Sequence, residues 1–287
     1  MNFYPKSLKR EATNFICRHL DIYPAELFEQ LPNNLKTNLL EQILRMKTHS
    51  HFLKSQQSSR ICQCHYCKHV DTSSPTSHLK RLMSLLINPD VGRLIWTLED
   101  LTTDLPLLSK CKKLRSLQLY VSKQRLLPSP CHNDLLTLFP MLPRLMELKL
   151  CNVDRVSAAL ITDEVLFTLC KSCPLLFSLS VEHCSHLTDA CMEAISELKN
   201  MSYLNLSKTN LTDAAFVNIR ETSPLVTSLT ELKLQDCLFL TNSVVKCFLI
   251  RCANLTLLNC LGCPRLNNFD LLFNNNTKIQ IYFTFDF

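Results

Sequence analysis

The sequence predicts an α/β solenoid, in which short parallel strands line a concave face and helices cover the convex face. A six-residue frame, L-x-x-L-x-L, recurs six times, and its copies start 31, 31, 25, 28 and 26 residues apart. A Thr-Asp or Thr-Asn pair follows four of the copies, beginning at Thr162, Thr188, Thr212 and Thr241. A unit of this length forms one strand and one helix, and it buries its apolar face only by stacking on its neighbours.

The frame forms the strand of each repeat. Side chains alternate across a strand, so the last two apolar residues of the frame face one side and the residues between them face the other. We expect the first residue of each such pair to stack as one rung of a continuous parallel ladder. These rungs are Leu117, Leu148, Leu179, Leu204, Leu232 and Leu258.

A small residue and then a helix are predicted to follow each strand. The chain turns where little volume is left, and the small residues at that point are Cys184, Thr209, Cys237 and Cys263. The Thr-Asp or Thr-Asn pair then supplies side-chain oxygens that cap the N-terminus of the helix. After Thr188, apolar residues recur at helical spacing at Met192, Ile195 and Leu198.

The two ends of the chain are predicted to form separate segments. Residues 1–47 are expected to be helical on both sides of Pro32, because Leu27, Leu31, Leu35, Leu39 and Ile43 recur every four residues. Residues 48–78 are polar and are expected to form a flexible insertion, and residues 79–278 form the solenoid. Residues 279–287 alternate apolar and polar side chains, which predicts a strand that closes the last repeat; a partner-binding strand is the alternative.

Composition argues against several classes of function. The chain contains only two glycines, which excludes a glycine-rich phosphate loop. Residues 91–287 hold 19 Lys and Arg against 18 Asp and Glu, so the main domain lacks the basic stripe of a nucleic-acid binder. No apolar run reaches the length of a membrane span. No cluster indicates a catalytic nucleophile with its base, and we expect a monomer that has no enzymatic activity and no cofactor.

Cysteine usage indicates where the protein resides. The chain has 16 cysteines, and its first residues lack the apolar core of a signal peptide. In a reducing compartment such thiols stay free and pack as small apolar side chains. We therefore expect a cytoplasmic or nuclear location.

One short segment has the residue types of a metal site. Cys62, Cys64, Cys67 and His69 lie within eight residues, and the spacing of Cys64 and Cys67 suits two thiolates on one tetrahedral ion. A second ligand pair is not evident nearby. A solvated, Ser-rich loop with incidental thiols is the alternative.

The outward side chains of the strands are the candidate binding face. They mix charges, amides, hydroxyls and tyrosines, which suits recognition of another protein; a merely solvated surface is the alternative. The candidates are Ser116, Gln118, Tyr120, Glu147, Lys149, Ser178, Ser180, Glu182, Tyr203, Asn205, Glu231, Lys233, Gln235 and Asn259.

The repeat resembles a known family. A period of about 26 residues with cysteines before and after the strand is similar to the cysteine-containing leucine-rich repeats of F-box/leucine-rich-repeat proteins. More narrowly, the chain resembles animal homologues of the yeast antagonist of the mitotic exit network. The matching stretches begin at Leu31, Asn88, Cys111 and Gly262. The resemblance implies a leucine-rich-repeat solenoid, ubiquitin-dependent protein catabolism and a role in the cell cycle.

The resemblance also implies that the N-terminal segment binds an adaptor protein. Part of the segment resembles the front half of an F-box, which binds an Skp-type adaptor, and part resembles the box that binds elongin. The protein would then be the substrate receptor of a cullin-type, SCF-like ubiquitin ligase. The candidate adaptor contacts are Leu8, Ile16, Leu27, Leu31, Pro32, Leu35, Leu39 and Ile43. A helical cap on the solenoid is the structural alternative. Two functional alternatives remain: a ligase-independent scaffold or inhibitor of a regulatory protein, such as a small GTPase, and a metal-binding protein that acts through residues 62–69.

Overall fold

The protein consists of two compact units, Met1–Leu94 and Ile95–Phe287. The computed structural model describes residues 13, 15–17, 23–24, 26–56, 77–98, 101–121, 132–151, 160–266 and 279–282. Candidate residues Leu8, Cys62, Cys64, Cys67 and His69 lie outside these ranges.

The first unit is helical. It contains α2 (Glu26–Glu29), α3 (Asn33–Gln56) and α4 (Ser77–Leu86), so helices lie on both sides of Pro32 as predicted. Helix α3 continues past the expected boundary at residue 47, because neither proline nor glycine interrupts it before Gln56. Helix α4 contacts α2 and α3, so residues 79–86 belong to this unit and not to the solenoid.

The second unit is built on one sheet, whose eight strands lie in sequence order. The strands are β1 (Arg93–Leu98), β2 (Ser116–Val121), β3 (Glu147–Cys151), β4 (Ser178–Ser180), β5 (Tyr203–Asn205), β6 (Glu231–Lys233), β7 (Leu257–Asn259) and β8 (Gln280–Tyr282). The boundary between the two units falls within β1. From β2 to β8 every neighbouring pair is parallel.

The predicted leucine ladder is confirmed. In the register of the sheet Leu117 pairs with Leu148, and the row continues without a shift through Leu179, Leu204, Leu232, Leu258 and Ile281. Its six leucines are at most 2% exposed. The fold is therefore a leucine-rich-repeat solenoid, and the predicted last strand extends the ladder at residues 280–282.

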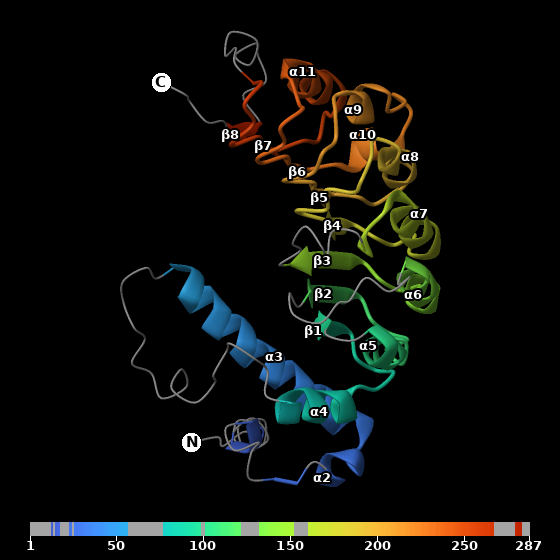
Figure 1. Ribbon diagram of the computed structural model, residues 1–287, viewed down its shortest axis with the longest axis vertical. Coiled ribbons are helices and arrows are strands. Elements are labelled where there is room, and N and C mark those ends of the chain that lie inside the picture. Colours follow the sequence, from blue (N-terminus) through green and yellow to red (C-terminus); the bar gives the residue numbers. More distant parts are fainter. Residues whose placement is uncertain are drawn as a thin grey trace, which may run out of the picture. The chain divides into compact units, whose positions relative to one another are not determined.

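Helices cover one side of this sheet. Figure 1 shows them on the convex side of the second unit and the strands on the concave side. The helices are α5 (Leu101–Leu108), α6 (His132–Leu138), the 3-10 turn η1 (Phe139–Met141), α7 (Asp163–Ser172), α8 (Cys191–Ser196), α9 (Ala214–Val217), α10 (Pro224–Ser228) and α11 (Asn242–Arg251). Met192 and Ile195 lie on α8 and are buried, as their helical spacing predicted; Leu198 is also buried, but α8 ends at Ser196, so the prediction that it lies on this helix is wrong.

A residue with left-handed backbone conformation precedes each of the small residues that follow the strands. His183, Lys208, Asp236 and Gly262 have φ of 68°, 59°, 55° and 75° and stand directly before Cys184, Thr209, Cys237 and Cys263. Three of the four are not glycine, so this repeated backbone feature has no glycine signature. Gly262 is needed for a further reason, because a Cβ there would lie 1.9 Å from Asp236 Oδ1.

The Thr-Asp pairs connect consecutive repeats. The carboxylate of Asp189 accepts hydrogen bonds from the backbone N–H of Thr212 at 2.8 Å and from its hydroxyl at 2.5 Å. Asp163 binds Thr188 in the same way, and Asp213 binds Thr241. The prediction that these aspartates cap their own helices is wrong, because each carboxylate accepts two hydrogen bonds from the threonine of the next repeat.

The threonines of these pairs do act near the helix N-termini. Each hydroxyl accepts from the N–H two residues later, at 3.3 Å for Ala190, Ala214 and Ser243. The hydroxyl thus donates to the preceding repeat and accepts from its own. Only in α11 does the side chain of the threonine itself cap the helix, so the capping prediction is confirmed at Thr241 and is wrong for α7, α8 and α9, which have no side-chain cap.

Buried cysteines also link repeats. The thiol of Cys263 donates to the carbonyl oxygen of Leu234 at 2.9 Å, and the thiol of Cys237 donates to that of Leu206 at 3.4 Å. Cys173 does the same toward Leu142. A small side chain with a weak donor therefore fits where the backbone of one repeat approaches that of the next.

The Thr-Asp link makes a testable contribution to stability. We predict that Asp189→Ala lowers the free energy of unfolding by about 1–2 kcal/mol, because two hydrogen bonds to a carboxylate are lost between repeats. Glu193→Ala, on the exposed side of α8, is the matched control and should change it by less than about 0.5 kcal/mol. Urea titrations followed by circular dichroism measure both. Equal effects of the two substitutions would contradict a stabilising role of the link.

Candidate functional site

The strand register arranges the candidate residues in two rows. One row runs through Ser116, Glu147, Ser178, Tyr203, Glu231 and Leu257, and the other runs through Gln118, Lys149, Ser180, Asn205, Lys233 and Asn259. Neighbouring strands lie about 4.8 Å apart, so the side chains of each row stand next to one another. The two rows point away from the buried leucines, toward the concave side.

The first row carries acidic and aromatic groups that reach solvent. Glu147, Tyr203 and Glu231 are half-buried, and Lys149 in the second row is exposed. Ser116 donates its hydroxyl proton to Glu147 Oε2 at 2.7 Å, and Lys233 Nζ lies 5.2 Å from the centre of the Tyr203 ring. Both contacts hold a charged group beside a neighbour on the next strand, so the face presents fixed charges of both signs.

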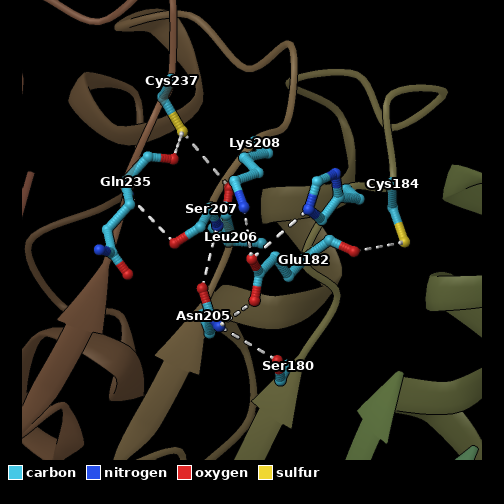
Figure 2. A network of polar contacts seen from close by, with 10 residues as sticks. Ser180, Glu182, Cys184, Asn205, Leu206, Ser207, Lys208, Gln235 and Cys237 are labelled. Atoms are coloured by element: carbon cyan, nitrogen blue, oxygen red, sulfur yellow. Dashed lines mark hydrogen bonds and ion pairs between the residues drawn. The ribbon is translucent and has the colours of Figure 1, made fainter. Parts of the chain in front are cut away.

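Two of the candidate residues belong to the interior. Ser180 and Asn205 are 2% and 6% exposed, which contradicts their assignment as contact residues. Asn205 donates to Ser180 Oγ at 3.2 Å and accepts from the backbone N–H of Ser207 at 3.0 Å (Figure 2). Their polar groups satisfy each other and the turn after β5, so these residues support the face from below.

A charged cluster stands beyond the ends of strands β4 and β5. Glu182 Oε1 lies 3.1 Å from Lys208 Nζ and 3.6 Å from His183 Nε2. Figure 2 shows Glu182 beside Lys208. Glu182 was a candidate, but Lys208 and His183 were not. Both occupy the left-handed position of their repeats, and alignment of the copies on Cys184 and Thr209 would have revealed that shared position.

The candidate residues of the remaining strands stay at the surface. Ser178, Glu231, Lys233, Gln235 and Asn259 are all half-buried. In β2, Gln118 donates to the hydroxyl oxygen of Tyr120 at 2.8 Å, which fixes both side chains. The second unit therefore brings together most of the predicted face.

The buried thiols of the described residues are poor nucleophiles and poor metal ligands. Burial raises the pKa of Cys111, Cys173 and Cys184 to about 12, because the thiolate would lose its hydration. Within the residues that the structure describes, no three His, Cys, Asp or Glu side chains meet to hold a metal ion. The predicted metal-binding segment lies outside those residues and stays a prediction.

The first unit presents part of the predicted adaptor surface. Leu27 and Leu35 are 53% and 36% exposed, Pro32 is exposed, and Ile16 and Leu31 are half-buried. Leu39 and Ile43 are 5% and 2% exposed, which contradicts their assignment as adaptor contacts. They lie on the face of α3 that forms the core of this unit.

None of the described helices has the length and hydropathy of a membrane span.

Comparisons with known proteins give the following matches. No protein-family model and no curated protein sequence matches the chain. Among solved structures, a TLR13–ssRNA13 complex aligns with a TM-score of 0.41 and 18% identity, over 71% of this chain and 30% of the matched chain. The complex of Rad7 and Elc1 in yeast aligns with a TM-score of 0.26 and 13% identity, over 96% of this chain and 93% of the matched chain. The protein thus spans less than a third of the length of its match in the first complex.

The burial of the thiols predicts slow alkylation. At pH 8 a pKa of about 12 leaves about a thousandth of the thiolate that a pKa of about 9 gives, and burial adds steric protection. We predict that iodoacetamide modifies Cys111, Cys173 and Cys184 at least about 100-fold more slowly in the native protein than in guanidinium chloride. Cys247, which is only half-buried, is the internal comparison and should react faster. Peptide mass spectrometry measures each site, and a native rate within about tenfold of the unfolded rate at Cys184 would contradict the burial.

Proposed function

We propose that the chain is a protein-binding module whose concave face holds a partner polypeptide. The observation that carries this proposal is the fixed row of unlike side chains across the strands. Tyr203 stands between acidic and hydroxyl neighbours in one row, and lysines stand in the other. Protein partners are recognised by aromatic anchors surrounded by such polar groups, and the register holds these groups in place before binding.

The proposed role of this face is positioning. Interleaved carboxylates and ammonium groups discriminate between partners by charge, whereas a face of one sign attracts any opposite charge. Buried groups such as Asn205 keep the strand ends rigid under the face. We propose that the chain brings a partner to another protein's chemistry and catalyses no reaction of its own.

The finer proposal is a substrate receptor of a cullin-type ubiquitin ligase. The concave face would hold the protein to be ubiquitinated, and the first unit would bind an Skp-type or elongin adaptor. Two features support this assignment: the resemblance of the N-terminal segment to adaptor-binding boxes, and the exposure of Leu27, Pro32 and Leu35. An exposed apolar helix surface commonly fills a groove of its partner. The resemblance alone supports a cell-cycle role, and the cysteine usage supports a location in the cytoplasm or nucleus.

A ligase-independent scaffold or inhibitor is the second candidate. The burial of Leu39 and Ile43 favours it, because two of the residues that resemble the adaptor box are occupied in the core. In this case the concave face would bind a regulatory protein, and the first unit would have only a structural role. The two candidates differ in whether an adaptor binds.

An adaptor-binding experiment separates these candidates. We predict that the full chain retains a recombinant Skp-type adaptor or recombinant elongin on an affinity resin. Leu27→Asp with Leu35→Asp should reduce the retained adaptor by at least about tenfold, because both charges would have to be desolvated in the interface. Ile250→Asp, at a side chain that is 82% exposed in the second unit, is the control and should retain it. Failure of the unmodified chain to bind either adaptor would favour the scaffold.

A charge-reversal experiment tests the concave face. We predict that Lys149→Glu with Lys233→Glu lowers the recovery of at least one partner from a cell lysate by about fivefold or more, because two attractive contacts become repulsive. Lys110→Glu with Lys246→Glu is the control, because it changes the net charge by the same amount at positions outside the two rows. Quantitative mass spectrometry compares the proteins that each variant captures. Equal loss in both variants would show that the net charge, and not this face, determines binding.

A further inference from the structure

A groove lies on the helix side of the second unit, between α7 and the connection that follows α8. Its volume is about 480 Å³, within the range of sites that hold a small ligand or a few side chains. Phe167 and Lys171 line it from α7, Pro174 from the turn after α7, and Leu198 and Lys199 from the connection between α8 and β5. The lining is mainly apolar.

The groove originates in unequal helix lengths. Helix α7 has 10 residues and α8 has only 6, although the strands that precede them are in register. The start of α7 is tied to the next repeat, because Asp163 accepts hydrogen bonds from Thr188. The last turn of α7 therefore lies beside the non-helical connection that follows α8, at Glu197, Leu198 and Lys199.

The groove exposes an aromatic side chain above a buried floor. Phe167 is 38% exposed, whereas Cys170 and Leu198 beneath it are 8% and 4% exposed. An aromatic side chain that stays exposed in a mainly apolar concavity is typical of a site that another molecule covers.

The charged groups at the groove leave a positive excess. Lys171 and Lys199 line it from its two sides, and within the described ranges neither forms an ion pair. The carboxylate of Glu197, which also lines the groove, is engaged by Arg220 Nη2 at 2.5 Å. A carboxylate of a bound molecule could therefore pair with either lysine without displacing an existing partner.

We propose that this groove binds a short segment of another protein in which a large apolar side chain is flanked by aspartate or glutamate. The apolar side chain enters between Phe167 and Leu198, and the flanking carboxylates pair with Lys171 and Lys199. The apolar part supplies most of the affinity, and the two charges select acidic flanks. Because α7 and α8 lie on the convex side in Figure 1, this site is separate from the concave face and does not depend on the function proposed for that face.

A labelled peptide tests the proposal on the full chain. The probe is a fluorescein-labelled Gly-Asp-Glu-Leu-Phe-Glu-Asp-Gly peptide, and fluorescence polarisation measures its dissociation constant. We expect a value of about 10–100 µM for this short segment. Replacing its Leu-Phe by Ala-Ala, or its four acidic residues by lysine, should weaken binding by at least about tenfold. No saturable binding of the probe would overturn the proposal.

Charge reversal in the protein locates the site. Lys171→Glu with Lys199→Glu should weaken binding of the probe by at least about tenfold, because attraction becomes repulsion. Lys110→Glu with Lys246→Glu is the matched control and should bind as the unmodified chain does. Phe167→Ser and the milder Phe167→Leu test the apolar contact, and their thermal unfolding midpoints verify the fold. Binding that is equally affected by both lysine pairs would overturn the proposal.

Two other outcomes would also overturn it. Equal binding of the acidic and the lysine-flanked peptides would mean that the groove accepts apolar side chains without selecting acidic flanks. A dimer in sedimentation velocity that Lys171→Glu with Lys199→Glu dissociates would make a second copy of the chain the occupant. Failure of adaptor binding in the first unit affects neither outcome, so this inference and the ligase proposal fail independently.

Discussion

The parallel register of strands β2 to β8 is the constraint on which the rest of the structure depends. Leu117, Leu148 and the residues that continue their row are buried only because no strand is shifted against its neighbour. A shift by one residue would expose one leucine to solvent and bury charged side chains such as Glu147 or Lys149. The same register therefore buries the core and fixes the order of the polar groups on the concave face.

Polar links on both sides of the ladder hold this register between consecutive repeats. Beyond the strand ends, the network around Asn205 joins the turns of neighbouring repeats, and near the helices the carboxylate of Asp189 binds Thr212. Each link reaches only the next repeat, as expected for a fold whose stability is a sum of units and nearest-neighbour interfaces. Because the groups of one repeat complete the hydrogen bonds of another, a single unit would leave several of them unsatisfied.

Sequence periodicity predicted the leucine rows and the helical spacing, and it missed side-chain contacts between repeats and turns that contain no glycine. The leucine rows, the helical spacing at Met192 and the break at Pro32 follow from local alternation and backbone stereochemistry. Among the aspartates of the Thr-Asp pairs only Asp213 stands at an N-cap, and its carboxylate binds Thr241 of the next repeat and not its own helix. Ser180 and Ser178 occupy equivalent outward positions, yet only Ser180 is buried, because Asn205 of the next strand bonds to it. The left-handed residue Lys208 has no glycine to mark it.

The two proposed binding surfaces differ because strands and helices are constrained differently in this fold. Each strand from β2 to β7 pairs with two neighbours, so the concave face changes by substitution of its outward residues while the backbone stays the same. A helix packs on neighbouring repeats through side chains, and the chain tolerates 10 residues in α7 next to 6 in α8. Length changes of this kind create a concavity on the helix side without moving the ladder, as the position of Phe167 beside Leu198 illustrates. One solenoid can therefore hold a polar recognition face and an apolar groove with basic rims, each adjustable without disturbing the other.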